Sequence, residues 1–340
     1  MKDIRNIPKK ELEAFIKENK APMFRVQQIE NWLWRNFVGS FDEMLNIPAQ
    51  LRTLLKKHYT LTVFQTEKIS ESPDGTLKVL VSFYDKAMVE AVLIPESQRV
   101  TVCISTQVGC PGACAFCATA SMGFKRNLTK AEIYAQVMLL QEIAESRLNR
   151  SISNVVIMGM GEPLLNYNAV ADFCNMISSE NGLHISAQKI TLSSVGIPEK
   201  IERMADDNVR CKLAISLHAA TNEKRDKIIP LNKKHPLPQL MKSLNYYYSI
   251  SHKEITFEYL LLKGFNDSRE DAEALVKLCR KVPSKVNLIA FNSFPGANYE
   301  RSPDLVMSDF MAVLEAGRIN VRLRKSRGGS INAACGQLLH

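Results

Sequence analysis

The most informative stretch of this chain is one short run, Gly109-Cys110-Pro111-Gly112-Ala113-Cys114-Ala115-Phe116-Cys117. Its three cysteines have the spacing C-x3-C-x2-C. Three thiolates this close together can hold three irons of a 4Fe-4S cube and leave the fourth iron open to a small molecule. Ferredoxin-type clusters take four cysteines, and a zinc site would need a fourth Cys or His nearby. The next histidine downstream is His184, so the run predicts an iron-sulfur cluster with an open iron rather than zinc.

Length and composition indicate an ordinary globular protein. A chain of 340 residues favours one large unit with a smaller accessory unit. No apolar run approaches the roughly 20 residues that a membrane span needs. The N-terminus leads into a charged helix, which predicts no secretory signal. Eight cysteines, three of them clustered, suit a reducing compartment, so we expect a cytoplasmic protein without a membrane partner.

The net charge of +9 is compatible with a polyanionic partner. Two regions concentrate the positive charge. The C-terminal segment from residue 318 onward holds five cations and no acid: Arg318, Arg322, Arg324, Lys325 and Arg327. The N-terminal helical region adds Lys9, Lys10, Lys17, Lys20, Arg25, Arg35, Arg52, Lys56 and Lys57. A solvated basic surface would explain the charge equally well if it were the only clue.

The apolar pattern divides the chain into three parts. Residues 1–60 form a helical accessory domain, because apolar residues recur at helical spacing from residue 9 to 59. Residues 61–98 form a β-hairpin or meander as a linker region, with alternating apolar residues after the turn at 72–75. Residues 99–340 alternate short apolar strands with amphipathic helices.

Six repeated βα units predict an α/β fold with a parallel sheet, either an open barrel or a doubly wound sheet. The expected strands are Val100–Ser105, Asn154–Met158, Lys189–Ser194, Lys212–Leu217, Glu254–Leu262 and Lys285–Phe291. The expected helices lie near 129–147, 166–180, 197–207, 236–251 and 268–281. In either arrangement the chemistry lies at the C-terminal ends of the strands. The cysteine loop follows the first of these strands.

Further strand ends carry groups that could bind a polar ligand. After the second strand comes Gly159-Met160-Gly161-Glu162-Pro163, whose glycines allow close approach and whose carboxylate can accept from an ammonium group. A tight turn alone would also use Gly and Pro. Later strand ends carry hydroxyls, an imidazole and an amide, which suit ribose and a carboxylate: Ser193, Ser194, Ser216, Leu217, His218 and Asn292. Each of these could instead be a capping residue.

Two lone cysteines add to this set. Cys335 lies near the C-terminus among small residues, so its thiol could swing into a crowded site, and flanking cations would favour the thiolate. An incidental tail cysteine is the alternative. Cys103 lies on the first strand of the βα series, where alternation leaves its direction open. The remaining cysteines occupy apolar settings typical of a core: Cys174, Cys211 and Cys279.

Taken together, these motifs resemble the RlmN/Cfr family of radical S-adenosylmethionine (SAM) RNA methyltransferases. The resemblance rests on Cys103-x6-Cys110-x3-Cys114-x2-Cys117, the turn at 159–163, the segment 122–128 and the terminal Ala333-Ala334-Cys335-Gly336-Gln337-Leu338. It covers nearly the whole chain. It implies a partial (β/α)6 barrel over residues 99–340, with a catalytic C-terminal tail and an N-terminal RNA-binding domain.

The resemblance also implies the cofactors and their ligands. Cys110, Cys114 and Cys117 would hold a 4Fe-4S cluster whose open iron binds SAM. The SAM contacts would be Gly161, Glu162, Pro163, Ser193, Ser194, Ser216, Leu217, His218 and Asn292. The family reaction methylates C2 of an adenosine in 23S ribosomal RNA, at the peptidyl-transferase centre, and of the tRNA adenosine next to the anticodon. It uses two SAM per turnover, and we expect a monomer that receives electrons from a flavodoxin- or ferredoxin-type donor.

Three residues would carry the reaction. By resemblance, Cys335 accepts a methyl group from SAM, a 5′-deoxyadenosyl radical activates that methyl group for addition to C2, and Cys103 resolves the RNA adduct as a disulfide. Glu90 matches the position of the base that removes the C2 proton. Strand alternation alone would place Glu90 on the solvent face, whereas an apolar site could raise its pKa and help it as a base.

One position departs from the family pattern, and two other functions stay open. Ser330 precedes Ile331 where the family usually has an acid, which puts the ordering of the tail in question. The first alternative function is Cfr-type methylation of C8 of the same ribosomal adenosine. The second is a non-catalytic iron-sulfur protein that binds RNA.

Overall fold

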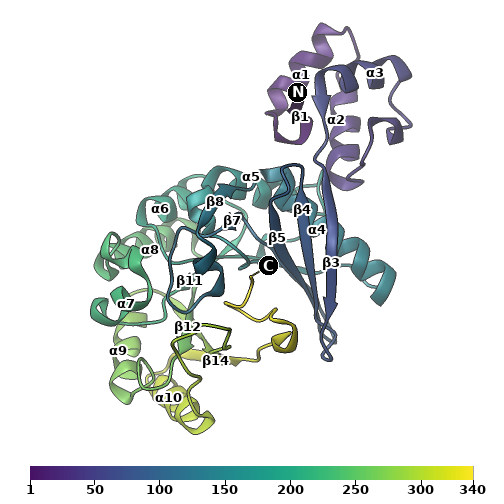
Figure 1. Cartoon of the computed structure of the whole chain (residues 1–340). Coiled ribbons are helices and arrows are strands. Elements are labelled where there is room, and N and C mark those ends of the chain that lie inside the picture. Colours follow the sequence, from purple (N-terminus) through teal and green to yellow (C-terminus); the bar gives the residue numbers. More distant parts are fainter. Residues whose placement is uncertain (340) are drawn as a thin grey trace.

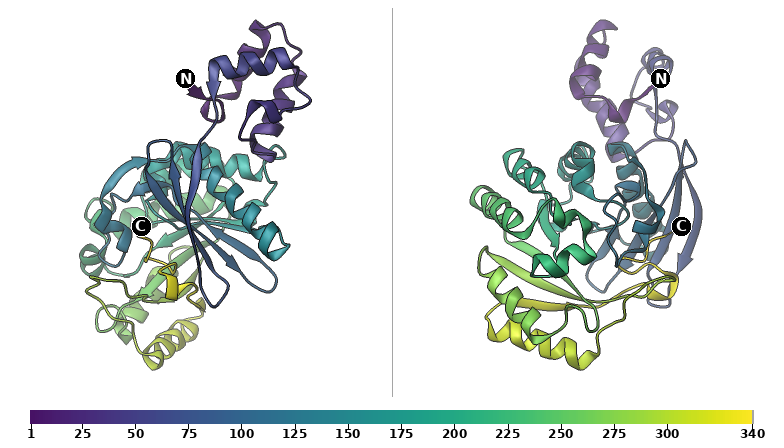
Figure 2. Two further views of the ribbon diagram at one scale, coloured as in Figure 1. Left: turned by 45° about the vertical axis from the view of Figure 1, so that its right-hand side comes forward. Right: turned by 60° about the vertical axis from the view of Figure 1, so that its left-hand side comes forward.

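A computed structural model describes residues 1–339 of the chain. The N-terminal module is helical, as predicted, and Figures 1 and 2 show it at one end of the molecule, above the body that holds the large sheet. Its elements are β1 (Lys2–Asp3), a 3-10 helix (Ile4–Asn6), α1 (Lys9–Glu18), α2 (Phe24–Glu30), a π-helical turn (Asn31–Arg35), a 3-10 helix (Phe41–Glu43), α3 (Ala49–His58) and β2 (Tyr59–Thr60).

The N-terminal module packs on the rest of the chain through aromatic contacts. The rings of Trp34 and Tyr134 meet edge to face with centroids 5.1 Å apart, and Phe37 stacks on Tyr134 at 5.6 Å. Asn6 Oδ1 accepts the Ala131 N–H at 3.2 Å, at the start of α4 (Lys130–Leu148). The module is therefore fixed to the helix that follows the cysteine loop.

One sheet of ten strands forms the body of the molecule, in the order β14-β13-β12-β11-β10-β9-β6-β5-β4-β3. The antiparallel part is the meander β3 (Phe64–Glu71), β4 (Leu77–Phe83) and β5 (Met88–Pro95). The parallel part is β6 (Val100–Cys103), β9 (Asn154–Ile157), β10 (Ile190–Ser194), β11 (Lys212–Ser216), β12 (Ile255–Leu261), β13 (Ser284–Ala290) and β14 (Asn320–Arg324). Because β3 and β14 are opposite edges of this sheet, the barrel is open.

Helices cover the outer face of the sheet in Figure 1. They are α4, α5 (Tyr167–Ser178), α6 (Pro198–Asp206), α7 (Asn222–Ile228), α8 (Leu237–Ser251), α9 (Arg269–Cys279) and α10 (Asp304–Ala316). The C-terminal tail, yellow in Figure 1, returns across the concave side toward β5. No helix among residues 1–339 has the length and apolar character to cross a membrane.

The predicted α/β architecture is confirmed, and the six predicted strands are present with ends shifted by one or two residues. The meander joins the parallel sheet directly, since β5 pairs antiparallel with β6. A seventh parallel strand, β14, was not predicted. Its sequence Asn-Val-Arg-Leu-Arg is charged, and only Val321 is buried, so it has the pattern of a basic surface segment until it pairs with β13.

Candidate active site

The cysteine loop is carried by a small hairpin of its own. Strands β7 (Gln107–Gly109) and β8 (Phe124–Asn127) pair antiparallel on either side of it. Gly109 closes this hairpin at φ +73°, and a Cβ there would lie 1.8 Å from the Gly123 carbonyl oxygen. The Cys110 N–H donates to that same oxygen at 3.0 Å. Only glycine fits at position 109, because any side chain would occupy the space of the second strand.

Cys110, Cys114 and Cys117 line one cavity together. A Cβ on Gly112 would lie 3.3 Å from Cys110 Sγ and 3.7 Å from Cys114 Sγ, so the loop folds around this glycine. Among residues 1–339, no three His, Cys, Asp or Glu side chains converge on one metal ion. A 4Fe-4S cube does not need such convergence, since each thiolate binds a different iron. Three cysteine thiols that line one cavity are therefore a set of donors that fits such a cluster.

Burial governs the ionisation of these thiols when no metal is bound. It raises the pKa of Cys110 to about 12 and raises the pKa of Cys114 and Cys117 as well. A bound metal reverses this preference because the coordinating thiol is deprotonated. The site therefore favours neutral thiols without iron and thiolates with it.

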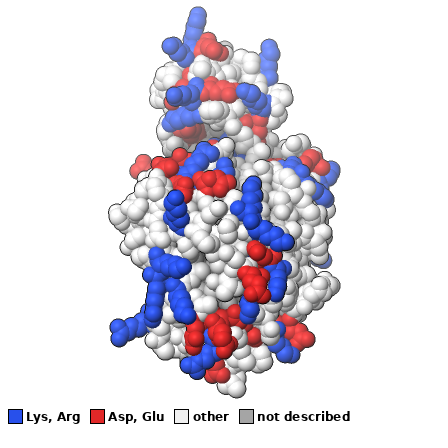
Figure 3. Space-filling model, turned by 90° about the vertical axis from the view of Figure 1, so that its left-hand side faces the viewer, with Lys and Arg blue, Asp and Glu red and all other residues white. Residues whose placement is uncertain are grey.

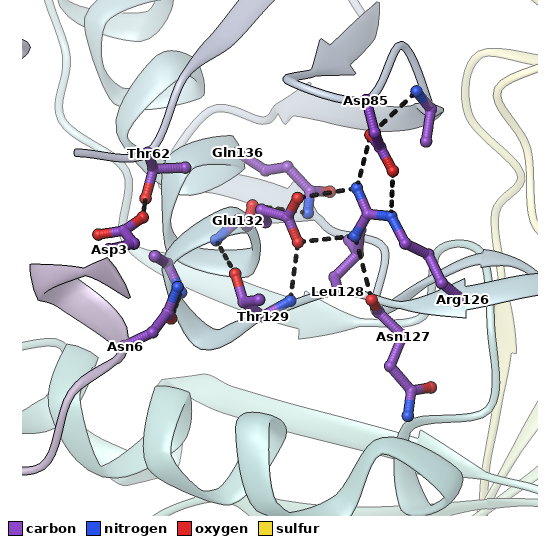
Figure 4. Close-up of polar contacts among 12 residues, drawn as sticks. Asp3, Asn6, Thr62, Asp85, Arg126, Asn127, Leu128, Thr129, Glu132 and Gln136 are labelled. Atoms are coloured by element: carbon purple, nitrogen blue, oxygen red, sulfur yellow. Dashed lines mark hydrogen bonds and ion pairs between the residues drawn. The ribbon is translucent and has the colours of Figure 1, made fainter. Parts of the chain in front are cut away.

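Arg126 fastens the hairpin to the body, as Figure 4 shows. Its guanidinium donates to both oxygens of Asp85, in the turn between β4 and β5, at 2.6 and 2.9 Å. It also donates to both oxygens of Glu132, in the first turn of α4, at 2.9 and 2.8 Å. Although burial opposes it, the two carboxylates raise the pKa of Arg126. This double bidentate contact fixes β8, and with it the cysteine loop.

The turn after β9 presses against the start of the cysteine hairpin. Gly161 has φ +103°, and a Cβ there would lie 2.6 Å from Gln107 Cβ. The Glu162 N–H donates to Gln107 Oε1 at 2.8 Å, and its carboxylate accepts the N–H groups of Leu164 and Val195 at 3.0 and 2.9 Å. Burial raises the pKa of Glu162. The carboxylate faces the cysteine cavity and can accept a further donor there.

The cavity beside the cysteines, about 120 Å³ in volume, brings most of the predicted SAM contacts together. Its lining includes Gly161, Glu162, Ser193, Ser194, Ser216 and His218. The hydroxyl oxygens of Ser193 and Ser216 are 3.2 Å apart, at the ends of neighbouring strands. His218 Nδ1 accepts the Leu260 N–H at 3.0 Å, and burial lowers the pKa of His218 to about 3. The imidazole is therefore neutral.

Three predicted SAM contacts lie outside this lining. The Leu217 side chain is in the core, and its carbonyl accepts from Arg225 Nε at 3.0 Å. Pro163 is buried at the start of the 3-10 helix Pro163–Asn166. Asn292 follows β13, and its Nδ2 donates to the Cys335 carbonyl at 3.4 Å. Asn292 thus contacts the tail.

Cys103 and Cys335 line a second and larger cavity, about 590 Å³, on the concave side of the sheet. Cys335 also lines the cysteine cavity, so this residue lies where the two cavities meet. Both thiols are free. The predicted thiolate character of Cys335 is opposed by desolvation, which raises its pKa although Arg324 acts in the other direction. Strand alternation left the direction of Cys103 open, and the structure places it on the concave side.

Contacts from three regions hold the tail in this position: the end of the cysteine loop, the segment after β13, and the turn between β3 and β4. The Ala118 N–H donates to the Gly336 carbonyl at 2.8 Å, next to the cysteine loop. Gln337 Nε2 donates to the Ser293 carbonyl at 2.7 Å. Ser330, which replaces the acid usual in the family, meets the hydroxyl of Ser72 at 2.9 Å. An acid contacts the tail all the same, because Asp74 Oδ2 accepts the Gly328 N–H at 3.0 Å.

Glu90 is buried, with 3% of its surface exposed, so the solvent-face interpretation of this residue is wrong. Its carboxylate pairs with Lys78 Nζ at 2.8 Å and accepts the Leu339 N–H at 2.8 Å. Lys78 Nζ also donates to the Asn332 carbonyl at 3.3 Å. The tail therefore brings its own backbone to the carboxylate that was assigned as the base.

Three polar residues of the site were not among the predicted site residues: Arg225, Glu258 and Arg324. Arg225 is fully buried and donates to the carbonyls of Leu217, Val195 and Ser216, which ties together the ends of β10 and β11. Glu258 and Arg324 line both cavities. The period-2 pattern of β12 could have marked Glu258 as a charged residue within an otherwise apolar strand. Arg225 had no comparable signal, because its helix is short and highly charged.

Comparison with known proteins agrees with this geometry. The family model described as "Radical SAM superfamily" matches residues 104–279. The model described as "Ribosomal RNA large subunit methyltransferase N-terminal domain" matches residues 2–61. Members of the first family use a 4Fe-4S cluster and SAM, and the three-cysteine loop is inside the matched range.

Relatives extend the similarity over the whole chain. The chain is 43% identical to a probable dual-specificity RNA methyltransferase RlmN of Christiangramia forsetii, over 99% of this chain and 96% of that protein. It is 41% identical to the dual-specificity RNA methyltransferase RlmN of Nautilia profundicola, over 93% and 92%. The crystal structure of a radical SAM methyltransferase from Sphaerobacter thermophilus superposes with a TM-score of 0.93 at 36% identity, covering 99% of both chains. The chain therefore belongs to the RlmN family of radical SAM RNA methyltransferases.

Proposed function

We propose that this enzyme methylates C2 of an adenosine in 23S ribosomal RNA and of the tRNA adenosine next to the anticodon, in the cytoplasm. The observation that supports this most directly is the position of Cys335, in the lining of both the cysteine cavity and the cavity that contains Cys103. A thiol at that junction can receive a methyl group from one side and present it to a base on the other.

The bound cluster would supply the electron that cleaves SAM to methionine and a 5′-deoxyadenosyl radical. Cys335 first displaces S-adenosylhomocysteine from one SAM and becomes S-methylcysteine. Its methyl group then loses a hydrogen atom to the radical from a second SAM, and the methylene carbon bonds to C2. The adduct would return one electron to the oxidised cluster and lose the C2 proton to a base, after which the Cys103 thiolate attacks the Cys335 sulfur. The methylene carbon then leaves, gains a proton and becomes the new methyl group, and external thiols reduce the disulfide.

Glu90 is the proposed acceptor of the C2 proton. Its carboxylate lies between Lys78 and the backbone N–H of Leu339, two residues that the chain brings together only through the tail. These partners hold the carboxylate close to the segment that carries Cys335. Removal of the proton by Glu90 and attack on Cys335 would therefore both take place beside the C-terminal tail.

The cavity that contains Cys103 is lined by an excess of cations. They are Arg99, Lys189, Lys212, Lys285, Arg322, Arg324, Lys325 and Arg327, against the acids Glu96 and Glu258. By contrast, Lys, Arg, Asp and Glu are interspersed on the face of the molecule shown in Figure 3. The cation-lined cavity suits a phosphodiester backbone, so we expect the target nucleotide to enter from this side. The basic N-terminal module would add backbone contacts farther away.

The experiment uses cells without the gene, to which the gene or a variant is returned, with mass spectrometry of nucleosides from ribosomal RNA and tRNA. We expect 2-methyladenosine in both with the native gene, none with Cys335→Ala, and normal levels with the control Cys279→Ala, which alters a core thiol. A product containing 8-methyladenosine without 2-methyladenosine would establish Cfr-type chemistry instead. Unchanged methylation with Cys335→Ala would refute the proposed route.

A further inference from the structure

Glu258 is a buried carboxylate whose hydrogen bonding is incomplete. It lies on β12, between Ser216 of β11 and Asn287 of β13 in the register of the sheet. Only 4% of its surface is exposed. Asn287 Nδ2 donates to Oε1 at 2.9 Å, whereas Oε2 is buried and has no partner among the described residues.

An unpaired carboxylate oxygen in such a position is unfavourable unless a ligand supplies a donor. The nearby cation does not fill this role. Arg324 influences Glu258 electrostatically, but its guanidinium donates to Met158 Sδ at 3.6 Å. The carboxyl group keeps an acceptor oxygen whether or not it is protonated. The unpaired oxygen therefore marks a place for an amine or a hydroxyl of a bound molecule.

Two bound molecules could supply that donor, because Glu258 lines both cavities. SAM carries an adenosine with an amine and ribose hydroxyls, and the RNA carries the target adenine. On the SAM side, the hydroxyls of Ser193 and Ser216 and the Glu162 carboxylate already offer acceptors. On the RNA side, cations and amides predominate, and Glu258 is one of two acids, the other being Glu96 at the exposed end. The SAM side therefore has other acceptors for an amine, whereas Glu258 is the buried carboxylate that can accept from a base on the RNA side.

We propose that Glu258 accepts a hydrogen bond from the 6-amino group of the target adenine and so selects adenine for methylation. In adenine, N1 lies between C2 and C6, and C6 carries the amino group, so a base whose C2 faces Cys335 has its amine a few ångströms away. Cys335 and Glu258 line the same two cavities, and the Glu258 carboxylate acts electrostatically on the Cys335 thiol, so one bound base can reach both residues. Guanine and hypoxanthine carry an oxygen at position 6, and this oxygen would face the ionised carboxylate, which has no donor. The inference rests on the function proposed above.

The test uses full-length reconstituted enzyme and RNA hairpins with adenosine, purine riboside or inosine at the target position. Glu258→Ala removes the acceptor, Glu258→Gln keeps one amide oxygen, and Glu254→Gln is the matched control, an exposed carboxylate just before the same strand. Formation of methylated nucleoside gives kcat/KM for each RNA. The ratio of kcat/KM for the adenosine RNA to kcat/KM for the purine riboside RNA is then calculated for each variant. It is compared with the same ratio for the wild type, so that the intrinsic reactivity of the two bases cancels.

We expect Glu258→Ala to lower the adenosine to purine riboside ratio by about 10- to 100-fold, the effect of leaving one buried polar group unpaired. Glu258→Gln should lower it less, and Glu254→Gln should leave it unchanged. Methylation of Cys335 by SAM without RNA, followed by intact-protein mass spectrometry, should proceed normally in all variants.

Three results would overturn the inference, and each has a different meaning. An unchanged base ratio in a folded, active Glu258→Ala enzyme shows that the carboxylate does not select the base. If Glu258→Ala loses methylation of Cys335 without RNA to the same extent as it loses turnover on RNA, the carboxylate binds SAM and not the base. Wild-type enzyme that methylates none of the RNAs refutes the proposed function itself. Thermal midpoints of all variants separate these results from misfolding.

Discussion

Replacement of Arg126 by Met tests whether the network in Figure 4 holds the cysteine loop in place. The guanidinium makes two bidentate contacts, with Asp85 and with Glu132. The Glu132 side chain is only 4% exposed, so loss of Arg126 leaves a buried carboxylate with the backbone N–H of Thr129 as its main partner. Breaking a buried pair in this way costs about 3–5 kcal/mol.

The partial exposure of Arg126 and Asp85 lowers the loss of stability that we expect from this substitution. The side chains of Arg126 and Asp85 are 25% and 29% exposed, and solvent screens that part of the network. We therefore expect a loss of about 2–3 kcal/mol, borne chiefly by the β7–β8 hairpin. At that magnitude, local opening of the hairpin becomes roughly 30- to 150-fold more frequent. The control is Arg147→Met, whose pair with Glu71 spans 3.4 Å between side chains that are 46% and 62% exposed, so we expect a loss of at most about 0.5 kcal/mol.

The assay is the rate at which a chelator removes iron from reconstituted enzyme without oxygen, together with the thermal midpoint. Arg126→Met should lose iron at least about ten times faster than wild type and Arg147→Met, because the chelator reaches the cluster through the open hairpin. Contacts with Arg126 lower the pKa of Asp85. Such a group stabilises the fold fully above its ordinary pKa, about 3.9, and loses that effect as the pH falls through the lowered value. The difference between variant and wild type should therefore be constant near neutral pH. Equal iron loss in the two Arg variants would refute this account of the loop.

Three further predictions concern the proposed reaction and its RNA. Cys103→Ala should yield enzyme covalently joined to RNA, because no thiol remains to attack Cys335; recovery of RNA-free protein after turnover would argue against resolution by Cys103. Glu90→Ala should accumulate the same adduct, since the C2 proton must leave first, and gel mobility before and after nuclease treatment would detect it; free product at the wild-type rate would exclude Glu90 as the base. Lys212→Gln should lower the slope of log affinity against log salt by about one for an RNA hairpin, measured by filter binding with Lys277→Gln, an exposed cation on α9, as the control; an unchanged slope would remove Lys212 from the RNA path.

Much of the site could be predicted from the sequence, because the residues concerned lie close together in the chain or at the ends of predicted strands. Cys110, Cys114 and Cys117 are neighbours in one loop, so their common cavity follows from the chain itself. Ser193, Ser216 and His218 could be placed together because the C-terminal ends of parallel strands meet at one edge of a sheet. Short-range patterns and a regular fold are enough to assemble such groups.

Other parts of the site depend on contacts that no local pattern records. Alternation assigned Glu90 to solvent, but the returning tail and Lys78 bury it. Arg225 comes from a charged helix, and only folding places strand-end carbonyls around it. The unpaired oxygen of Glu258 is visible only when its neighbours on β11 and β13 are known.

The sequence by itself determined that three cysteines lie in one loop after a buried strand, within an α/β chain that carries a lone cysteine near its C-terminus. The tertiary structure alone decided that this last cysteine, 218 residues beyond Cys117 by their numbers 335 and 117, lies between the cluster loop and Cys103. The physical reason is the range of the interactions. Spacing within a loop is fixed by covalent geometry, whereas the position of a distant tail is fixed by hydrogen bonds and burial that exist only after the sheet has formed.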